Sequence, residues 1–180
     1  MINVKNLINL LKKHNSNFFT GVPDSVLKEL SFSLQVKNKK NHIIAANEGS
    51  AVSIGIGHYL STKRIPIIYM QNSGLSNALN PLISIAHKNV YSIPLILIIG
   101  WRGSPRVKDE PQHNAKGRIT EKLLKLLNIR YTILRSSSDL NKFEKQIKFA
   151  RKNKSIVACL IEQGTLEKSY KEKNKKDFYN

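Results

Sequence analysis

The chain has 180 residues, of which 41% are hydrophobic and 23% are charged, so it is long enough to bury the core of one globular domain. Its formal net charge is +18, a basic balance that is typical of many nucleic-acid-binding proteins. However, the lysines are spread along the chain and are densest at its C-terminal end, and few aromatic residues are interleaved with them. Nucleic acid is therefore not the favoured partner.

The cysteine content and the apolar segments exclude two further classes of protein. Cys159 is the one cysteine, so a disulfide framework is excluded and a reducing cytoplasm is the expected location. The longest apolar stretch, Ile93 to Trp101, is far too short to span a bilayer, and the N-terminus lacks the plan of a signal peptide. We expect a cytoplasmic protein that does not enter a membrane.

Hydrophobic periodicity predicts helices and strands that alternate along the chain. Asp24 is expected to cap the second helix, and Pro81 is expected to kink or restart the fourth. From Glu167 the chain is charged, so we expect a domain over 1–166 and a basic, poorly ordered tail over 167–180. The expected helices span 2–14, 25–36, 51–60, 74–86, 117–127 and 139–152, and the expected strands span 17–20, 42–46, 65–70, 94–100, 131–134 and 155–161.

This alternation predicts an α/β fold with a doubly wound, mostly parallel, six-stranded sheet and helices on both faces. The strands are continuously apolar, which indicates that both faces of the sheet are covered. In such sheets ligands bind beyond the carboxyl ends of the strands. The polar, glycine-containing segments 21–25, 47–50, 71–77 and 101–117 all follow strand ends, so we expect one edge of the sheet to carry the function.

Glu48 follows one of these strand ends, in the segment Asn47-Glu48-Gly49-Ser50-Ala51, and its carboxylate has two explanations. It can complement the positive end of the following helix, as first-turn acids commonly do. It can also share a proton with a ligand ring, since its small neighbours would let a flat ring approach. A similar ambiguity holds for Ser73 and Gly74, which open a helix either as a plain cap or as donors to an anion or a ring.

The segment from Gly100 to His113 contains three cations, two acids, a histidine and a tryptophan. Loops of this length in a compact domain are usually functional or disordered, and Trp101, two prolines and internal ion pairs argue against disorder. Arginines suit phosphonate, sulfonate, phosphate or carboxylate groups, because the guanidinium forks onto them. The histidines of the chain do not form a zinc pattern, so no metal ligand is predicted.

Four motifs in one order are together specific for a known family: FFTGVPDS, AANEGSAVSIGIGHYL, IPIIYMQNSGLSNALNPL and SIPLILIIGWRGSPRVKDEPQH. Over about Phe18 to Tyr131, the chain resembles the pyrimidine-binding domain of thiamine-diphosphate-dependent decarboxylases. Within that family it looks most like the phosphonopyruvate decarboxylases and the alpha subunits of sulfopyruvate decarboxylases. Any one of these motifs alone would be a weak signal.

The resemblance implies a chemical role for Glu48. The matching glutamate of the family hydrogen-bonds N1′ of the cofactor's aminopyrimidine and favours its imino tautomer, so that the exocyclic nitrogen can deprotonate C2 of the thiazolium. The ylid then attacks the keto carbon, and carbon dioxide leaves because the thiazolium ring accepts the electrons. By the same resemblance, the pyrimidine pocket would also be lined by Gln71, Asn72, Ser73 and Gly74.

The resemblance also implies which groups handle protons and substrate. Asp24 lies in a Gly-Val-Pro turn like the one that presents an active-site acid in related enzymes. Those enzymes often have one more residue before the acid, so either Asp24 or Ser25 would face the site, and Asp24 as a simple helix cap is the alternative. Gln112 and His113 fall where relatives place histidines that handle protons on the enamine intermediate.

The second half of the family's site is missing from the sequence. That half binds magnesium and the diphosphate through Gly-Asp-Gly and a later Asn-Asn, and neither occurs here. A diphosphate is held poorly without a cation to offset its charge. The implied cofactors are therefore thiamine diphosphate and Mg²⁺, with Mg²⁺ held by a diphosphate-binding beta subunit in a hetero-oligomer. A fragment of a fused protein is the alternative, although the initial methionine and the charged end favour a natural subunit.

The leading hypothesis is that this chain, with its partner, decarboxylates 3-phosphonopyruvate to phosphonoacetaldehyde. Arg102, Arg106 and Lys108 are the candidates for binding the anionic group of this small 2-keto acid. Sulfopyruvate is the alternative substrate, since it too carries a carboxylate, a ketone and a tetrahedral anion, but the segment Lys108 to His113 looks more like the phosphonopyruvate enzymes. The hypothesis from another class is a non-catalytic basic module that binds an anionic metabolite or nucleic acid.

Overall fold

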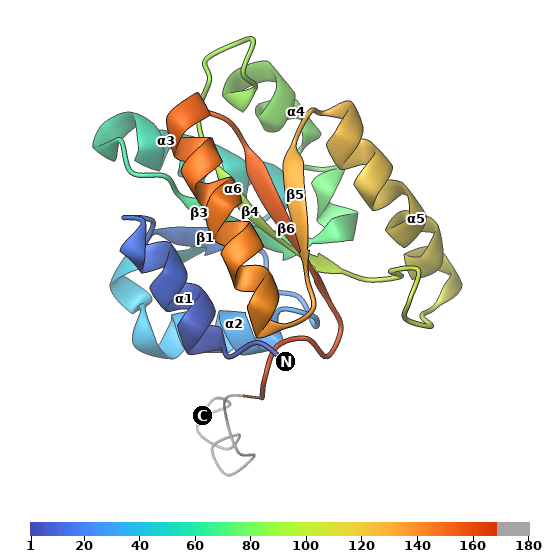
Figure 1. Cartoon of the computed structure of the whole chain (residues 1–180). Coiled ribbons are helices and arrows are strands. Elements are labelled where there is room, and N and C mark those ends of the chain that lie inside the picture. Colours follow the sequence, from blue (N-terminus) through green and yellow to red (C-terminus); the bar gives the residue numbers. More distant parts are fainter. Residues whose placement is uncertain (169–180) are drawn as a thin grey trace.

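A single parallel sheet organises the computed structural model, which describes residues 1–168 (Figure 1). The strand order is β2-β1-β3-β4-β6-β5, and every neighbouring pair is parallel. The predicted doubly wound α/β fold is confirmed, with a sheet that is wholly parallel. The strands are β1 (Phe19–Gly21), β2 (His42–Ile44), β3 (Ile67–Gln71), β4 (Ile96–Trp101), β5 (Arg130–Leu134) and β6 (Val157–Glu162).

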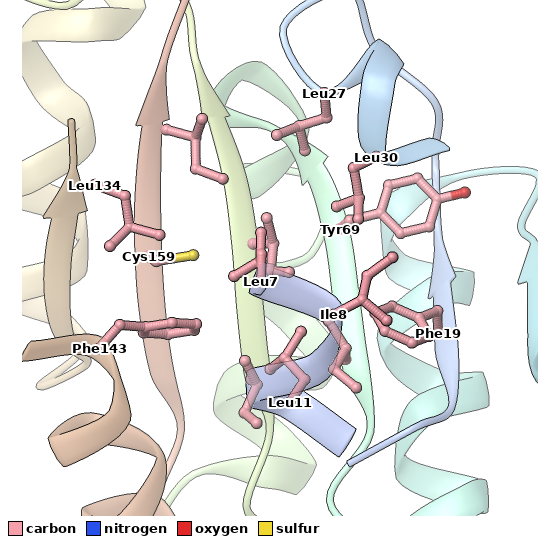
Figure 2. Close-up of a cluster of buried hydrophobic side chains, with 14 of the residues drawn as sticks. Leu7, Ile8, Leu11, Phe19, Leu27, Leu30, Tyr69, Leu134, Phe143 and Cys159 are labelled. Carbon is pink, nitrogen blue, oxygen red and sulfur yellow. The ribbon is translucent and has the colours of Figure 1, made fainter. Parts of the chain in front are cut away.

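Helices cover both faces of this sheet and bury two apolar clusters. The helices α1 (Val4–Lys13), α2 (Lys28–Lys37) and α6 (Leu140–Asn153) contribute to the cluster on one face. Figure 2 shows part of this cluster, in which Leu7 and Leu11 of α1 approach the sheet and Cys159 is fully buried. Burial raises the pKa of the Cys159 thiol, which fits a small buried hydrophobe rather than a reactive group.

The second cluster lies under α3 (Glu48–Thr62), α5 (Pro111–Leu126) and the segment between β3 and β4. That segment consists of the 3₁₀ turn η2 (Asn72–Leu75), the short α4 (Leu79–Pro81) and the π-helical turn η3 (Leu82–Ala86). Pro81 thus ends one helical turn and precedes another, so the predicted restart is confirmed. Two further 3₁₀ turns are η1 (Lys39–Asn41) and η4 (Ser137–Asp139).

Three expectations about local structure are wrong. Ile43 and Ile44 of the edge strand β2 are 44% and 52% exposed, so this strand is not covered on both faces. Helix α2 begins at Lys28 with Leu27 as its N-cap residue, so Asp24 does not cap it. Helix α5 begins at Pro111 rather than at 117, since proline is favoured at the first position of a helix, and the loop after β4 is correspondingly shorter.

The register of the sheet brings the strand ends together at one edge. Gly21 at the end of β1 is level with Tyr69, and Gln71 at the end of β3 is level with Gly100. On the other side of β4, Trp101 is level with Glu162. The segments that follow β1, β2, β3 and β4 therefore share the carboxyl edge, where ligands bind in parallel α/β sheets.

The described end of the chain returns to the N-terminus. Leu166 forms a parallel bridge with Ile2, and the amide of Glu167 donates to the carbonyl of Ile2 at 2.9 Å. Glu167, the first residue of the predicted tail, is thus tied to the domain, and positions 169–180 of that tail lie outside the described residues. Within residues 1–168, no helix is both long and apolar enough to cross a membrane.

Two helical glycines make opposite predictions for stability. A Cβ at Gly117 of α5 would come within 1.7 Å of the carbonyl oxygen of Gly103, whereas a Cβ at Gly57 of α3 would meet nothing within 4 Å. We expect Gly117→Ala to lower the free energy of unfolding by about 1–3 kcal/mol, because the added methyl group would overlap the backbone of Gly103. The matched variant Gly57→Ala should raise it by up to about 1 kcal/mol, because alanine is the better helix former. Urea unfolding of the isolated chain measures both, and equal stability of the two variants would contradict the close approach.

Candidate functional site

Glu48 is the first residue of α3, and its side chain reaches across to the segment that follows β3. The helix is capped by the neighbouring Asn47, whose side-chain oxygen accepts from the amide of Ser50 at 2.8 Å. The carboxylate of Glu48 instead accepts from Nδ2 of Asn77 at 3.0 Å. It also lies against Gly74, where a Cβ would come within 2.2 Å of Oε1. Glu48 therefore has a specific place at the carboxyl edge in addition to the favourable helix-end position.

The four residues predicted to line the pyrimidine pocket differ in how exposed their polar groups are. Gln71 and Ser73 are half-buried and hydrogen-bond each other at 2.7 Å, while Gly74 touches Glu48. Asn72 is buried and points the other way. Its Nδ2 donates to the carbonyl of Arg102 and to Oγ1 of Thr120, both at 3.0 Å, and its Oδ1 accepts from the amide of Arg102 at 3.1 Å. Its amide is thus used to join the ends of β3 and β4 to α5.

Asp24 lies over the end of β4, in the turn between β1 and α2. Its Oδ1 accepts from the amide of Val26 at 2.6 Å, while Oδ2 is buried and has no hydrogen-bond partner among the described residues. A Cβ at Gly100 would come within 2.7 Å of this Oδ2, so only glycine leaves room for the carboxyl. Burial raises the pKa of Asp24, and the opposing effects of two backbone amides, of Arg102 and of the Gln71 side chain are smaller.

Arg102 is the most firmly held cation of the loop after β4. Its Nε and Nη2 donate to the two carboxylate oxygens of Asp109 at 2.7 and 2.6 Å, and its Nη1 donates to Oγ of Ser25 at 3.3 Å. Asp109 also accepts from the amides of Gly103 and Glu110, both at 2.9 Å. The guanidinium holds the pKa of Asp109 well below its usual range. The predicted internal ion pair of the loop is confirmed by this contact.

The remaining predicted residues lie on the outer side of this loop. Arg106 and Lys108 are exposed. Gln112 and His113 are in the first turn of α5, where Gln112 donates to Oε2 of Glu110 at 2.6 Å and Nε2 of His113 lies 3.6 Å from the same oxygen. No group of three His, Cys, Asp or Glu side chains within 1–168 is placed to hold a metal ion.

Two residues that touch the predicted ones were not predicted from the sequence. Asp109 was counted only as an acid of the loop, although it organises Arg102 and two backbone amides. Asn77 was not considered beyond its place in a motif, although it donates to Glu48. Local spacing does not reveal either contact. They join residues 7 and 29 positions apart, and the direction of each side chain depends on how the strand ends are arranged.

A family model matches most of the chain. Residues 3–124 match the model described as "Thiamine pyrophosphate enzyme, N-terminal TPP binding domain". The chain belongs to this family. The resemblance based on four motifs is therefore confirmed at the level of the family, and thiamine pyrophosphate is the same compound as thiamine diphosphate.

Curated relatives fall into two groups. The chain is 36% identical over 119 residues to a phosphonopyruvate decarboxylase of Streptomyces viridochromogenes, which covers 66% of this chain and 29% of that protein. It is also 36% identical over 124 residues to the "Sulfopyruvate decarboxylase subunit alpha" of Methanocaldococcus jannaschii, covering 68% of this chain and 70% of the relative. The chain thus spans less than a third of the first relative and most of the second.

A solved structure shares the fold. The benzoylformate decarboxylase of Polynucleobacter necessarius superposes with a TM-score of 0.72 at 20% identity, covering 96% of this chain and 32% of that one. A thiamine diphosphate-dependent 4-hydroxybenzoylformate decarboxylase of Rhodococcus jostii superposes with a TM-score of 0.64 at 17% identity, covering 89% and 30%. At these identities the likeness shows the fold alone.

The buried carboxyl of Asp24 makes a prediction for stability against pH. Because its pKa is raised in the folded chain, the ionised form costs stability at neutral pH, and this cost disappears as the pH falls below the ordinary value of 3.8. We expect Asp24→Asn to raise the thermal midpoint at pH 7 by on the order of 2 °C. The gain should vanish near pH 3.

The control is Asp139→Asn, because backbone hydrogen bonds lower the pKa of Asp139 and its ionised form stabilises the fold. This variant should lower the midpoint at pH 7. Midpoints measured from pH 3 to pH 7 test both signs. A lower midpoint for Asp24→Asn at neutral pH would contradict the raised pKa.

Proposed function

We propose that this chain is the pyrimidine-binding subunit of a thiamine-diphosphate-dependent 2-keto acid decarboxylase. The observation that carries the proposal is the position of Glu48. In a chain of this family, its carboxylate extends from the strand-to-helix turn onto the bare backbone of Gly74, at the carboxyl edge of the sheet. This is the place where a carboxylate can accept a hydrogen bond from a planar ring that approaches over small residues.

The residues of the edge fit one half of the cofactor. A carboxylate acceptor and the uncharged polar groups of Gln71 and Ser73 suit an aminopyrimidine, which offers ring nitrogens and an exocyclic amine. When bound, thiamine diphosphate would supply the electron sink for loss of carbon dioxide. Glu48 would hold a proton shared with N1′ of the pyrimidine. The described residues include no carboxylate or histidine cluster for Mg²⁺, so we assign the diphosphate and Mg²⁺ to a partner chain.

Two further groups would act on the substrate at this edge. Asp24, whose pKa burial raises, would hold a proton at higher pH than an ordinary aspartate and could donate it to the reacting carbons. His113, in the first turn of α5, is the other candidate for proton handling, and its neighbour Gln112 would contact the substrate. Arg102 would bind the anionic group, because its Nη1 faces Ser25 while Asp109 holds its other two nitrogens. Arg106 and Lys108 would attract the anion from the exposed side of the loop.

The proposed substrate is 3-phosphonopyruvate, which would yield phosphonoacetaldehyde and carbon dioxide. Support comes from the name of the first relative and from the cations of the loop. Sulfopyruvate is the second candidate, and a specific observation favours it. The chain covers 70% of a protein named as a sulfopyruvate decarboxylase alpha subunit but only 29% of the phosphonopyruvate decarboxylase. Both readings share the same reaction and the same role for Glu48.

A diphosphate-binding beta subunit is part of the proposal. The "subunit alpha" names of three relatives imply that those proteins have a partner. In this chain the apolar side chains of Ile43 and Ile44 are exposed on β2, just before the turn that carries Glu48. Exposed apolar residues next to a functional edge are typical of a surface that another subunit covers. A hetero-oligomer would place the two halves of the cofactor site on different chains.

The role of Glu48 can be tested with an isosteric variant. The chain is mixed with its beta chain, thiamine diphosphate and Mg²⁺, and carbon dioxide release from phosphonopyruvate and from sulfopyruvate is measured. Glu48→Gln should reduce kcat/KM by a factor of about 10²–10⁴ or more, because the amide cannot share a proton as a carboxylate does. Glu121 lies on α5 and accepts a hydrogen bond from Tyr131, so the control Glu121→Gln should keep kcat/KM within about threefold of the wild type. Full activity of Glu48→Gln would refute the role of Glu48.

The need for a partner makes a separate prediction. The chain alone, at saturating thiamine diphosphate and Mg²⁺, should show no decarboxylation above the background rate, because no group of three His, Cys, Asp or Glu side chains among the described residues is placed to hold the Mg²⁺ that offsets the diphosphate charge. Addition of the beta chain should restore activity in proportion to the complex formed. Activity of the isolated chain would contradict the split site. A salt-sensitive affinity for nucleic acid without any decarboxylation by the mixture would instead favour a basic binding module.

A further inference from the structure

The side chain of Asn77 hydrogen-bonds the carboxylate of Glu48. Asn77 lies between η2 and α4 and is exposed, so burial does not explain why its side chain turns towards the edge. Its Nδ2 donates to Oε2 of Glu48 at 3.0 Å, across 29 residues of sequence. The backbone that carries it is fixed, since the amide of Asn77 donates to the carbonyl of Gly74 at 3.0 Å. The donor therefore comes from a hydrogen-bonded turn.

Two glycines allow this contact to form. A Cβ at Gly49 would come within 3.0 Å of the carbonyl oxygen of Asn77, so the start of α3 and the turn after β3 approach each other closely. A Cβ at Gly74 would collide with the carboxylate of Glu48. Glu48 and Asn77 are thus held on facing segments, and the carboxylate lies between Gly74 and the amide of Asn77.

This contact makes the two oxygens of the Glu48 carboxylate different, because only Oε2 accepts a hydrogen bond from Asn77. An amide N–H on Oε2 occupies that oxygen and limits rotation of the carboxylate about its terminal bond. Oε1 is then the oxygen left to share a proton with a ring. An amide is a neutral donor, so it can hold the carboxylate in place without adding a positive charge that would compete with the ring for it.

We propose that Asn77 is a positioning residue that orients the carboxylate of Glu48, so that Oε1 faces the aminopyrimidine. This inference rests on the proposed function of Glu48. It assigns Asn77 no direct contact with the substrate, and it predicts an effect on the chemical step and on cofactor binding that depends on the presence of Glu48.

Asn47 provides a matched control at the same end of α3. It is also an exposed asparagine, and it is adjacent to Glu48 in sequence, but its side chain caps the helix through the amide of Ser50. Asn47→Ala removes a hydrogen bond that supports the helix and leaves the bond to the Glu48 carboxylate in place. Asn77→Ala removes the bond to the Glu48 carboxylate and leaves the helix cap in place. A general loss of structure near Glu48 should therefore appear in the first variant at least as much as in the second.

The experiment compares these variants in the complex with the beta chain and Mg²⁺. We expect Asn77→Ala to lower kcat by at least tenfold with the substrate KM within threefold, and to weaken thiamine diphosphate binding about tenfold by calorimetry. Asn47→Ala should lower the unfolding midpoint more than Asn77→Ala does, and should keep kcat within threefold. The isosteric Asn77→Asp replaces the donor with a second carboxylate and should lower kcat further than Asn77→Ala. It also provides the test of the inference if the alanine variant fails to fold.

A double-mutant cycle separates positioning from a structural effect. In the Glu48→Gln background, Asn77→Ala should change thiamine diphosphate affinity by less than twofold, because there is no longer a carboxylate to orient. An equal loss of affinity in both backgrounds, or kcat within threefold of wild type for Asn77→Ala and Asn77→Asp, would overturn the inference. Full activity of Glu48→Gln alone would instead remove the proposed function, so the two failures are distinguishable.

Discussion

The buried amide of Asn72 is the interaction on which the arrangement of the carboxyl edge depends. It bonds to both backbone groups of Arg102 and to Thr120, and so joins the ends of β3 and β4 to α5. An unpaired buried amide would cost about 1–3 kcal/mol, so these three groups are held in one arrangement. With the backbone of Arg102 fixed, its guanidinium can meet both Asp109 and Ser25. Asn72 was predicted to line the cofactor pocket, and in the structure its side-chain amide holds neighbouring residues in place.

Close backbone approaches set the rest of the edge. Gly103 adopts a positive φ of 65° and passes so near α5 that a Cβ would meet the carbonyl of His113 at 1.8 Å. Gly117 of α5 faces Gly103 at this approach, because a Cβ at Gly117 would meet the carbonyl of Gly103. The loop after β4 is therefore tightly packed against the start of α5, despite its many charges. This packing brings Gln112 and His113 to the same loop that holds Arg102.

The sequence was sufficient for the architecture and for the place of Glu48, because both follow from patterns. Alternating apolar segments predict the parallel sheet, and the rule for strand ends puts Glu48 and Asp24 on one edge. The sequence was not sufficient for the side-chain partners. The motif around Asn72 gave no sign that its amide bonds to Arg102 and Thr120, and a Gly-Val-Pro-Asp turn before a helix resembles a cap. Here the next helix begins only at Lys28, and the carboxyl of Asp24 turns inwards over Gly100.

Two carboxylates at the edge are held in opposite electrostatic conditions. Asp109 receives two bonds from a guanidinium and two from backbone amides, which favour its ionised form. Asp24 lies against Gly100 of β4, and burial favours its protonated form. Arg102 lowers the pKa of both carboxyls, but it hydrogen-bonds Asp109 through two nitrogens, and its effect on Asp24 is smaller than that of burial. Burial therefore shifts the pKa of Asp24 in the opposite direction to the shift that Arg102 causes in Asp109, so two carboxyls of one edge differ in how readily they take up a proton.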